Sequence, residues 1–101
     1  MTTQVTTECP LCHSNASFSA IDTRRKHLRC PTCGEFVLWR AAEGRLQRSA
    51  AQTLEMFSRE ARSTTNKDYL YVIRGSSSDS PPHVDLQGEA LPRAAALDPA
   101  D

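Results

Sequence analysis

Residues 9–34 read CPLCHSNASFSAIDTRRKHLRCPTCG, and this stretch contains all four cysteines of the 101-residue chain. The cysteines form two pairs, Cys9 with Cys12 and Cys30 with Cys33, and seventeen residues separate the pairs. Two Cys-x-x-Cys pairs at this separation are typical of a tetrahedral zinc site, in which each short turn brings two sulfurs to one side. The backbone amides of such a turn face the thiolates and offset part of their charge. The pattern therefore predicts one structural Zn²⁺ held by these four cysteines.

Other cysteine chemistries fit the pattern less well. No stretch approaches the ~20 apolar residues of a membrane helix, and the start, MTTQVTTECP, lacks the layout of a signal peptide. We therefore expect a soluble cytoplasmic protein with reduced thiols rather than disulfides. The run from Cys9 to His13 matches the attachment pattern of c-type haem, but haem would leave Cys30 and Cys33 without a role. A thioredoxin-like couple needs a βαβ unit, which surrounds neither pair. Iron in place of zinc stays open, because both metals accept four thiolates.

The chain carries no pattern that predicts catalysis. Four cysteines complete a tetrahedron, so His13 and His27 are interpreted as surface or supporting residues, and no coordination position is left for water. The sequence shows no Ser/His/Asp set, phosphate-binding glycine loop or paired carboxylates. We therefore do not expect an enzyme, and nothing in the sequence indicates a small-molecule substrate or a membrane partner.

The residues around the cysteines alternate in the manner of strands. Phe18 and Ala20 alternate with Ser19 and Ile21, the run TRRK is suited to a turn, and HLR leads into the second pair. The run EFVLWR, after Gly34, has the composition of a third strand. Gly34 lies where a residue with positive φ often closes a cysteine turn. We therefore predict a β-hairpin and a third strand over residues 9–40.

These features resemble a zinc ribbon: CPLC, a hairpin-length insert, and CPTCG followed by an apolar stretch. The resemblance covers residues 8 to about 40 and implies a metal-stabilised ribbon. Zinc ribbons occur in transcription factors, polymerase subunits, ribosomal proteins and small bacterial and phage proteins. The spacing is also loosely similar to that of a phage translational regulator of the Com type. The resemblance is specific for the metal and says little about function.

The rest of the chain predicts one helix, one strand and a tail. Ser49 and Gln52 fit a capping box, and a buried face at helical spacing follows, with the helix ending near residue 62 or 63. A turn over residues 41–46 is possible, and YLYVI reads as a strand. We thus expect a small α+β protein with a flexible N-terminus (1–8), a zinc ribbon (9–40), a helix–strand extension packed on it (41–74) and a disordered acidic tail (75–101). The core candidates are Phe36, Leu38, Leu54, Phe57, Leu70 and Val72.

Charge is unevenly distributed, although the chain as a whole is neutral. Residues 1–75 hold eleven Lys/Arg against seven Asp/Glu, and residues 76–101 hold one against five, giving +4 and −4. Four thiolates on one Zn²⁺ would reduce the +4 to about +2. Basic residues gather at the expected hairpin tip, and such a cluster can contact phosphates, although a solvated turn explains it equally well. The cluster comprises Arg24, Arg25, Lys26 and Arg29, with His27 among them.

Two classes of function follow. The first is a nucleic-acid-binding or regulatory accessory module that contacts DNA or RNA through the basic cluster, and the acidic tail would weaken that contact by folding back. The second is an adaptor that docks on a protein partner through the ribbon and the helix. Trp39 is expected to be covered by the helix or the tail, with an exposed binding anchor as the alternative.

Overall fold

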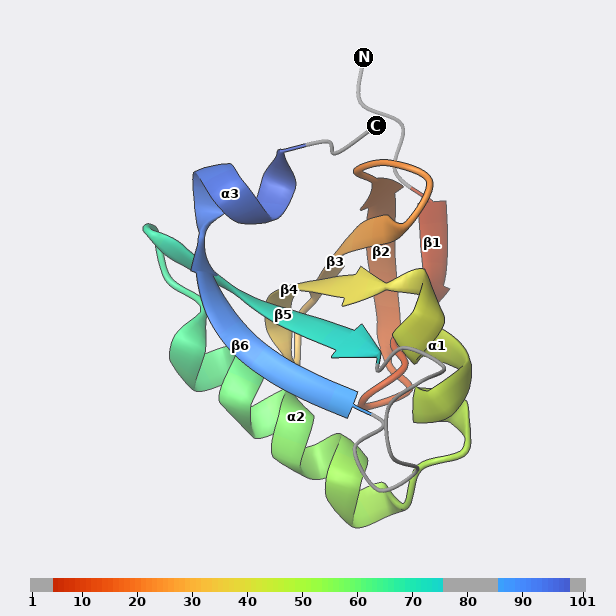
Figure 1. Ribbon diagram of the computed structural model, residues 1–101. Helices are drawn as coiled ribbons and strands as arrows, with labels where there is room; N and C mark the ends of the chain where they lie inside the picture. The colour runs from red at the N-terminus through yellow and green to blue at the C-terminus, as the bar shows by residue number, and fades with distance from the viewer. Residues whose placement is uncertain (1–4, 76–85, 99–101) are drawn as a thin grey trace.

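A computed structural model of the chain describes residues 5–75 and 86–98 (Figure 1). Within them, six strands form one mixed sheet in the order β1-β2-β3-β4-β5-β6, accompanied by three helices. Neighbouring strands are antiparallel except β4 and β5, which are parallel because two helices cross between them. The elements are β1 (Val5–Glu8), β2 (Asn15–Ala20), β3 (Arg25–Cys30), β4 (Gly34–Trp39), α1 (Arg40–Gln47), α2 (Ala51–Thr64), β5 (Tyr69–Gly75), β6 (Leu86–Pro92) and α3 (Arg93–Leu97).

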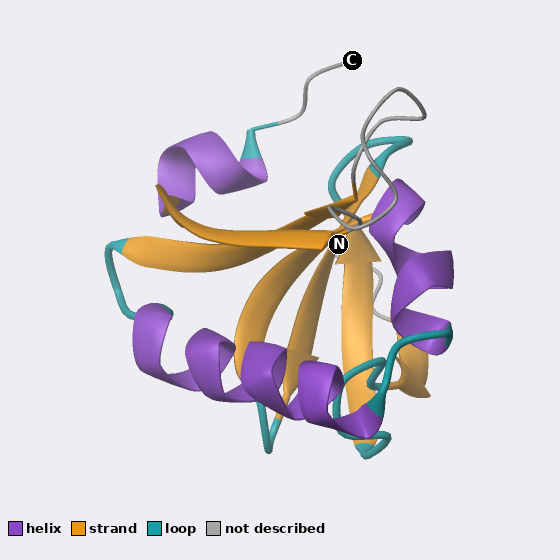
Figure 2. Ribbon diagram, turned by 60° about the horizontal axis from the view of Figure 1, so that its bottom comes forward, coloured by secondary structure: helices purple, strands orange, loops and turns teal. Residues whose placement is uncertain are grey.

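The two faces of the sheet are buried by different elements. Figure 2 shows α2 and α3 on opposite sides of the sheet. Strand residues alternate between the faces, so Phe36 and Leu38 pack toward α1, α2 and the cysteines, whereas Val37 and Val72 pack toward Ala96 of α3. All six predicted core residues are buried, but they divide between two apolar clusters: Phe36, Leu38, Leu54 and Phe57 lie in one, and Leu70 and Val72 lie in the other.

The predicted hairpin and third strand are present as β2, β3 and β4. The turn between β2 and β3 spans residues 21–24, two residues earlier than the predicted run TRRK, because Arg25 and Lys26 already belong to β3. The carboxylate oxygen Oδ1 of Asp22 accepts hydrogen bonds from the backbone N–H groups of Arg24 at 2.8 Å and Arg25 at 2.9 Å. Such an Asx turn lets the chain reverse early. Gly34 has φ of 83°, as predicted.

The predicted capping box is wrong. Helix α2 begins after Ala50, and no side chain caps its first turn. The Ser49 hydroxyl instead donates to the carbonyl oxygen of Arg45 at 2.8 Å, because the preceding turn is a helix of its own, α1. The predicted helical face is present in α2, with Leu54, Phe57 and Ala61 buried, but Ala50, which the same spacing places on that face, precedes the helix and is exposed.

The predictions for the two ends of the chain are corrected where the structure describes them. Residues 5–8 form β1, which pairs with β2, and residues 1–4 lie outside the described residues. Residues 86–98, predicted as disordered, form β6 and α3, because β6 pairs along the whole of β5 and Leu91, Ala96 and Leu97 cover the second face. The rest of the predicted tail, 76–85 and 99–101, lies outside the described residues.

One glycine in β6 lets a side chain cross the strand. Gly88 lies opposite Ile73, and a Cβ atom at Gly88 would lie 1.7 Å from the hydroxyl oxygen of Tyr71. The Tyr71 ring therefore occupies the space that any larger residue at position 88 would need, and its hydroxyl donates to a carboxylate oxygen of Glu60 on α2.

None of the helices in the described residues is long and apolar enough to cross a membrane.

Candidate metal centre and surrounding surfaces

The four cysteine sulfurs converge at one place. Cys9 and Cys12 lie in the turn between β1 and β2, and Cys30 and Cys33 flank the turn between β3 and β4. All four Sγ atoms lie within 4.8 Å of one another, with Cys9 and Cys33 3.7 Å apart and Cys12 and Cys30 3.3 Å apart. A tetrahedral zinc ion with sulfur bonds of about 2.3 Å places its sulfurs about 3.8 Å apart. The cysteines are free, and their separations exceed the ~2.05 Å of a disulfide. The cage could hold one metal ion.

The two cysteine turns close in the same way. The residue after each pair has a left-handed backbone: His13 has φ of 64° and Gly34 has φ of 83°. In the first turn the N–H of His13 donates to the carbonyl oxygen of Cys9 at 2.9 Å, and the N–H of Cys9 donates to that of Ser14 at 2.8 Å. The left-handed conformation costs a residue with a side chain roughly 1–2 kcal/mol, and glycine avoids this cost.

Hydrogen-bond donors surround the sulfurs. Backbone N–H groups of Leu11 and Cys12 bond the sulfur of Cys9, and the Ser58 hydroxyl of α2 lies 3.0 Å from the sulfur of Cys33. Without a metal, the hydrogen bond with Cys33 lowers the pKa of Cys9 to about 5, and the same bond raises the pKa of Cys33, because one proton is retained between the two sulfurs. A bound cation must displace such a proton, so metal affinity depends on pH.

The two histidines near the cysteines have other partners. His13 Nδ1 lies 2.9 Å from a carboxylate oxygen of Glu8, and His27 Nε2 lies 2.9 Å from one of Glu35.

Three of the four cysteines are buried, and Cys12 is partly exposed. A tetrahedral ion bound by four protein sulfurs keeps no position for water, so the centre suits a structural metal.

The structure divides the predicted basic cluster. Arg25 is buried, forms an ion pair with Asp22 at 2.8 Å and donates to the carbonyl oxygen of Ala96 at 3.0 Å. The ammonium group of Lys26 pairs with Glu43 at 2.7 Å. Arg24 and Arg29 are exposed, but they lie toward opposite ends of β3.

A basic and aromatic surface that the sequence predicted only in part, through Arg24 and Trp39 but not Arg40, lies where β4 passes into α1. The backbone N–H of Arg40 donates to the carbonyl oxygen of Arg24 at 2.7 Å, which holds these two exposed arginines beside each other. Partly buried Trp39 adjoins Arg40 in the chain, and all three residues line a cavity of about 410 Å³ with Thr23 and Ala41. Neither arginine forms an ion pair with a carboxylate of the described residues. The adjacency of Trp39 and Arg40 was visible in the sequence, but the approach of Arg24 was not.

A polar network joins Arg93, at the start of α3, to Glu35 of β4 and His27 of β3. Both guanidinium N–H groups of Arg93 donate to the Glu35 carboxylate at 3.2 Å, and Glu35 also bonds His27. Glu35 on β4 is thus held on two sides. The hydrogen bond from Arg93 lowers the pKa of Glu35, and burial lowers the pKa of His27. The network positions α3 and touches no cysteine among the described residues.

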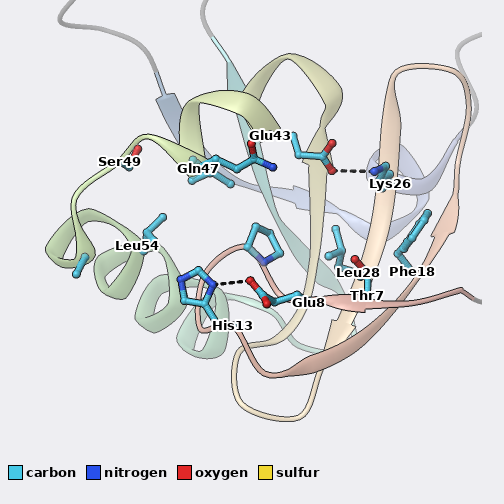
Figure 3. Close-up of a pocket in the computed structure, with 13 residues that line it drawn as sticks. Thr7, Glu8, His13, Phe18, Lys26, Leu28, Glu43, Gln47, Ser49 and Leu54 are labelled. Carbon is cyan, nitrogen blue, oxygen red and sulfur yellow. Dashed lines mark hydrogen bonds and ion pairs between the residues drawn. The ribbon is translucent and has the colours of Figure 1, made fainter.

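A second cavity, of about 430 Å³, lies between strands β1–β3, α1 and the start of α2. Figure 3 shows its side chains, with the ion pairs Lys26–Glu43 and His13–Glu8 apart from each other in the lining. Its apolar lining includes Phe18, Leu28, Leu46 and Leu54.

Comparisons with known proteins find no family model, curated protein or solved structure that matches this chain.

Proposed function

We propose that the chain is a zinc-binding protein in which Cys9, Cys12, Cys30 and Cys33 hold one structural Zn²⁺, and that the surface around Trp39 binds nucleic acid. The convergence of four sulfurs within 4.8 Å carries the metal part of the proposal. Zinc is favoured over harder cations because all four donors are thiolates. The ion would join the turn before β2 to the turn before β4 and so fix one end of the sheet.

The arrangement of β2, β3 and β4 around the two cysteine turns supports the zinc-ribbon interpretation. The ribbon strands are continuous with β5 and β6, so the structure extends the ribbon into a larger sheet rather than adding a separate unit.

Arg24 and Arg40 carry the nucleic-acid part of the proposal. They are exposed, held together by a backbone hydrogen bond, and adjacent to an aromatic ring. Guanidinium groups bind phosphate oxygens, and aromatic rings stack on bases. The described residues contain twelve Lys/Arg and nine Asp/Glu, a formal +3, and a four-thiolate zinc centre reduces this to about +1. Affinity therefore depends on this local pair of arginines rather than on the field of the whole protein.

Binding of a labelled mixed-sequence nucleic acid, measured by fluorescence anisotropy across a salt series, tests this proposal. We expect binding by the zinc-loaded protein at about 50 mM salt that falls steeply toward 200 mM. The absence of binding at the low-salt end would overturn the nucleic-acid role while leaving the metal centre intact.

A further inference from the structure

Three neighbouring hollows share their lining residues. The cavity beside Trp39 and a smaller one of about 250 Å³ at the hairpin tip share Thr23, Arg24 and Arg40. The smaller cavity shares Phe18 and Lys26 with the cavity of about 430 Å³ between the sheet and α1. These shared residues place the three cavities next to one another, in a surface strip that extends from Trp39 around the end of the β2–β3 hairpin to the opposite face of the sheet. We call it the tip track and define it by Phe18, Thr23, Arg24, Lys26, Trp39 and Arg40.

Aromatic and basic side chains alternate along the tip track, as bases and phosphates alternate along a nucleic-acid strand. At one end, the guanidinium carbon of Arg25 lies 5.8 Å from the centre of the Trp39 ring, and Arg25 is itself fixed by Asp22 and Ala96. The ring is thus held beside a fixed cation, packs against the apolar cluster that includes Val37 and Ala96, and borders the cavity with part of its surface. A ring held in this way is suited to stacking a base. Arg24 and Arg40 follow, where a phosphate would lie.

The other end of the tip track suits a base rather than a phosphate. The ammonium group of Lys26 lies 4.8 Å from the centre of the Phe18 ring at the mouth of the larger cavity. The lining of that cavity is mixed: apolar side chains such as Phe18, Leu28 and Leu54 lie beside polar ones, and the carboxylates of Glu8 and Glu43 are among the polar groups (Figure 3). Carboxylates repel phosphate and accept hydrogen bonds from N–H groups of bases. The cavity volume lies within the range of small-ligand pockets.

We propose that the tip track binds single-stranded nucleic acid, with one base on Trp39, the backbone along Arg24 and Arg40, and another base in the cavity beyond Lys26. The inference rests on the proposed nucleic-acid function and specifies its substrate class. A duplex keeps its bases stacked and paired, so they could not reach Trp39 and the cavity at the same time.

The test uses the single tryptophan of the chain as its reporter. The full-length, zinc-loaded protein is titrated with a short oligodeoxythymidine and, separately, with a mixed-sequence duplex at about 50 mM salt. We expect tighter binding of the single strand, together with quenching of Trp39 fluorescence. The double variant Arg24→Ala/Arg40→Ala should bind roughly tenfold more weakly, with a salt slope lower by about 1.4, from two lost single-strand phosphate contacts. Arg29→Ala removes an exposed arginine from the far end of β3 and is the matched control, with nearly unchanged affinity.

The outcomes separate the two proposals. Equal or tighter binding of the duplex, or saturation by the single strand without a change in Trp39 fluorescence, would overturn the tip track and leave a nucleic-acid role in place. An equal loss in Arg29→Ala and in the double variant would also overturn it, because binding would then follow total charge. The absence of binding to either probe would overturn both proposals.

Discussion

Replacing Gly34 with alanine should destabilise the zinc-loaded protein by about 1 kcal/mol. Gly34 has φ of 83°, and a Cβ atom there would meet no other atom within 4 Å. The substitution therefore introduces no clash, and its cost is that of the backbone alone, roughly 1–2 kcal/mol for a left-handed residue. Alanine also restricts the unfolded chain, which returns about 0.4–1 kcal/mol. The difference leaves a net loss of about 1 kcal/mol.

Gly44→Ala is the matched control for this prediction. A Cβ atom at Gly44 would also meet nothing within 4 Å, but Gly44 lies inside α1 and lacks the positive φ. Alanine should therefore stabilise α1 by about 0.5–1 kcal/mol. Urea unfolding at saturating zinc measures both variants. Effects of the same sign in the two variants, or a Gly34→Ala protein as stable as the parent, would refute the role assigned to the left-handed backbone after Cys33.

Three further substitutions test the packing and the polar networks. Asp22→Ala should destabilise the fold by about 3–5 kcal/mol in urea unfolding, because it leaves the buried guanidinium of Arg25 without its ion-pair partner; a loss under about 1 kcal/mol would contradict this. Gly88→Ala should lower the melting temperature, because the added methyl group would displace the Tyr71 ring from its hydrogen bond with Glu60. Adding Tyr71→Phe removes the hydroxyl but keeps the ring, so the double variant should melt no higher than Gly88→Ala if the ring itself is the obstacle. Burial lowers the pKa of His27, so the folded state takes up a proton at lower pH than the unfolded state, and stability should fall as the pH drops below about 6.5. In His27→Asn the stability should decrease less as the pH drops, and a pH dependence of stability equal to that of the parent would contradict the role assigned to His27.

The parts of the fold that the sequence predicts are those determined by local pattern. The cysteine spacing, the strand periodicity around Phe36 and Leu38, and the glycine after Cys33 each identify a feature without knowledge of distant partners. The helical face of Leu54 and Phe57 belongs to the same class. These elements account for the metal cage and for the face of the sheet that covers it.

The remaining features depend on partners far away in the chain. The composition of 75–101, averaged as a whole, predicts disorder, yet Leu91 and Ala96 bury against Val72 once β6 pairs with β5. Arg25 looks like a solvated turn residue until α3 supplies the Ala96 carbonyl as its partner. A charge count along the sequence cannot distinguish such a buried arginine from exposed Arg24.

The same reasoning explains why the surface that we propose for nucleic acid was predicted only in part. Arg24 was among the predicted contacts, but Arg40 joins it only through the backbone hydrogen bond between the hairpin tip and the start of α1. The candidate surface therefore depends on the register of β3 with β4, in which Arg25 lies opposite Trp39.

The central claim is the four-cysteine metal centre, and native mass spectrometry of the untagged protein before and after chelation tests it most directly, with circular dichroism of the stripped form. We predict one zinc ion per chain, bound through Cys9, Cys12, Cys30 and Cys33, and loss of structure when it is removed. A protein that binds no metal with its thiols reduced, or that keeps its full circular dichroism after chelation, would contradict the claim.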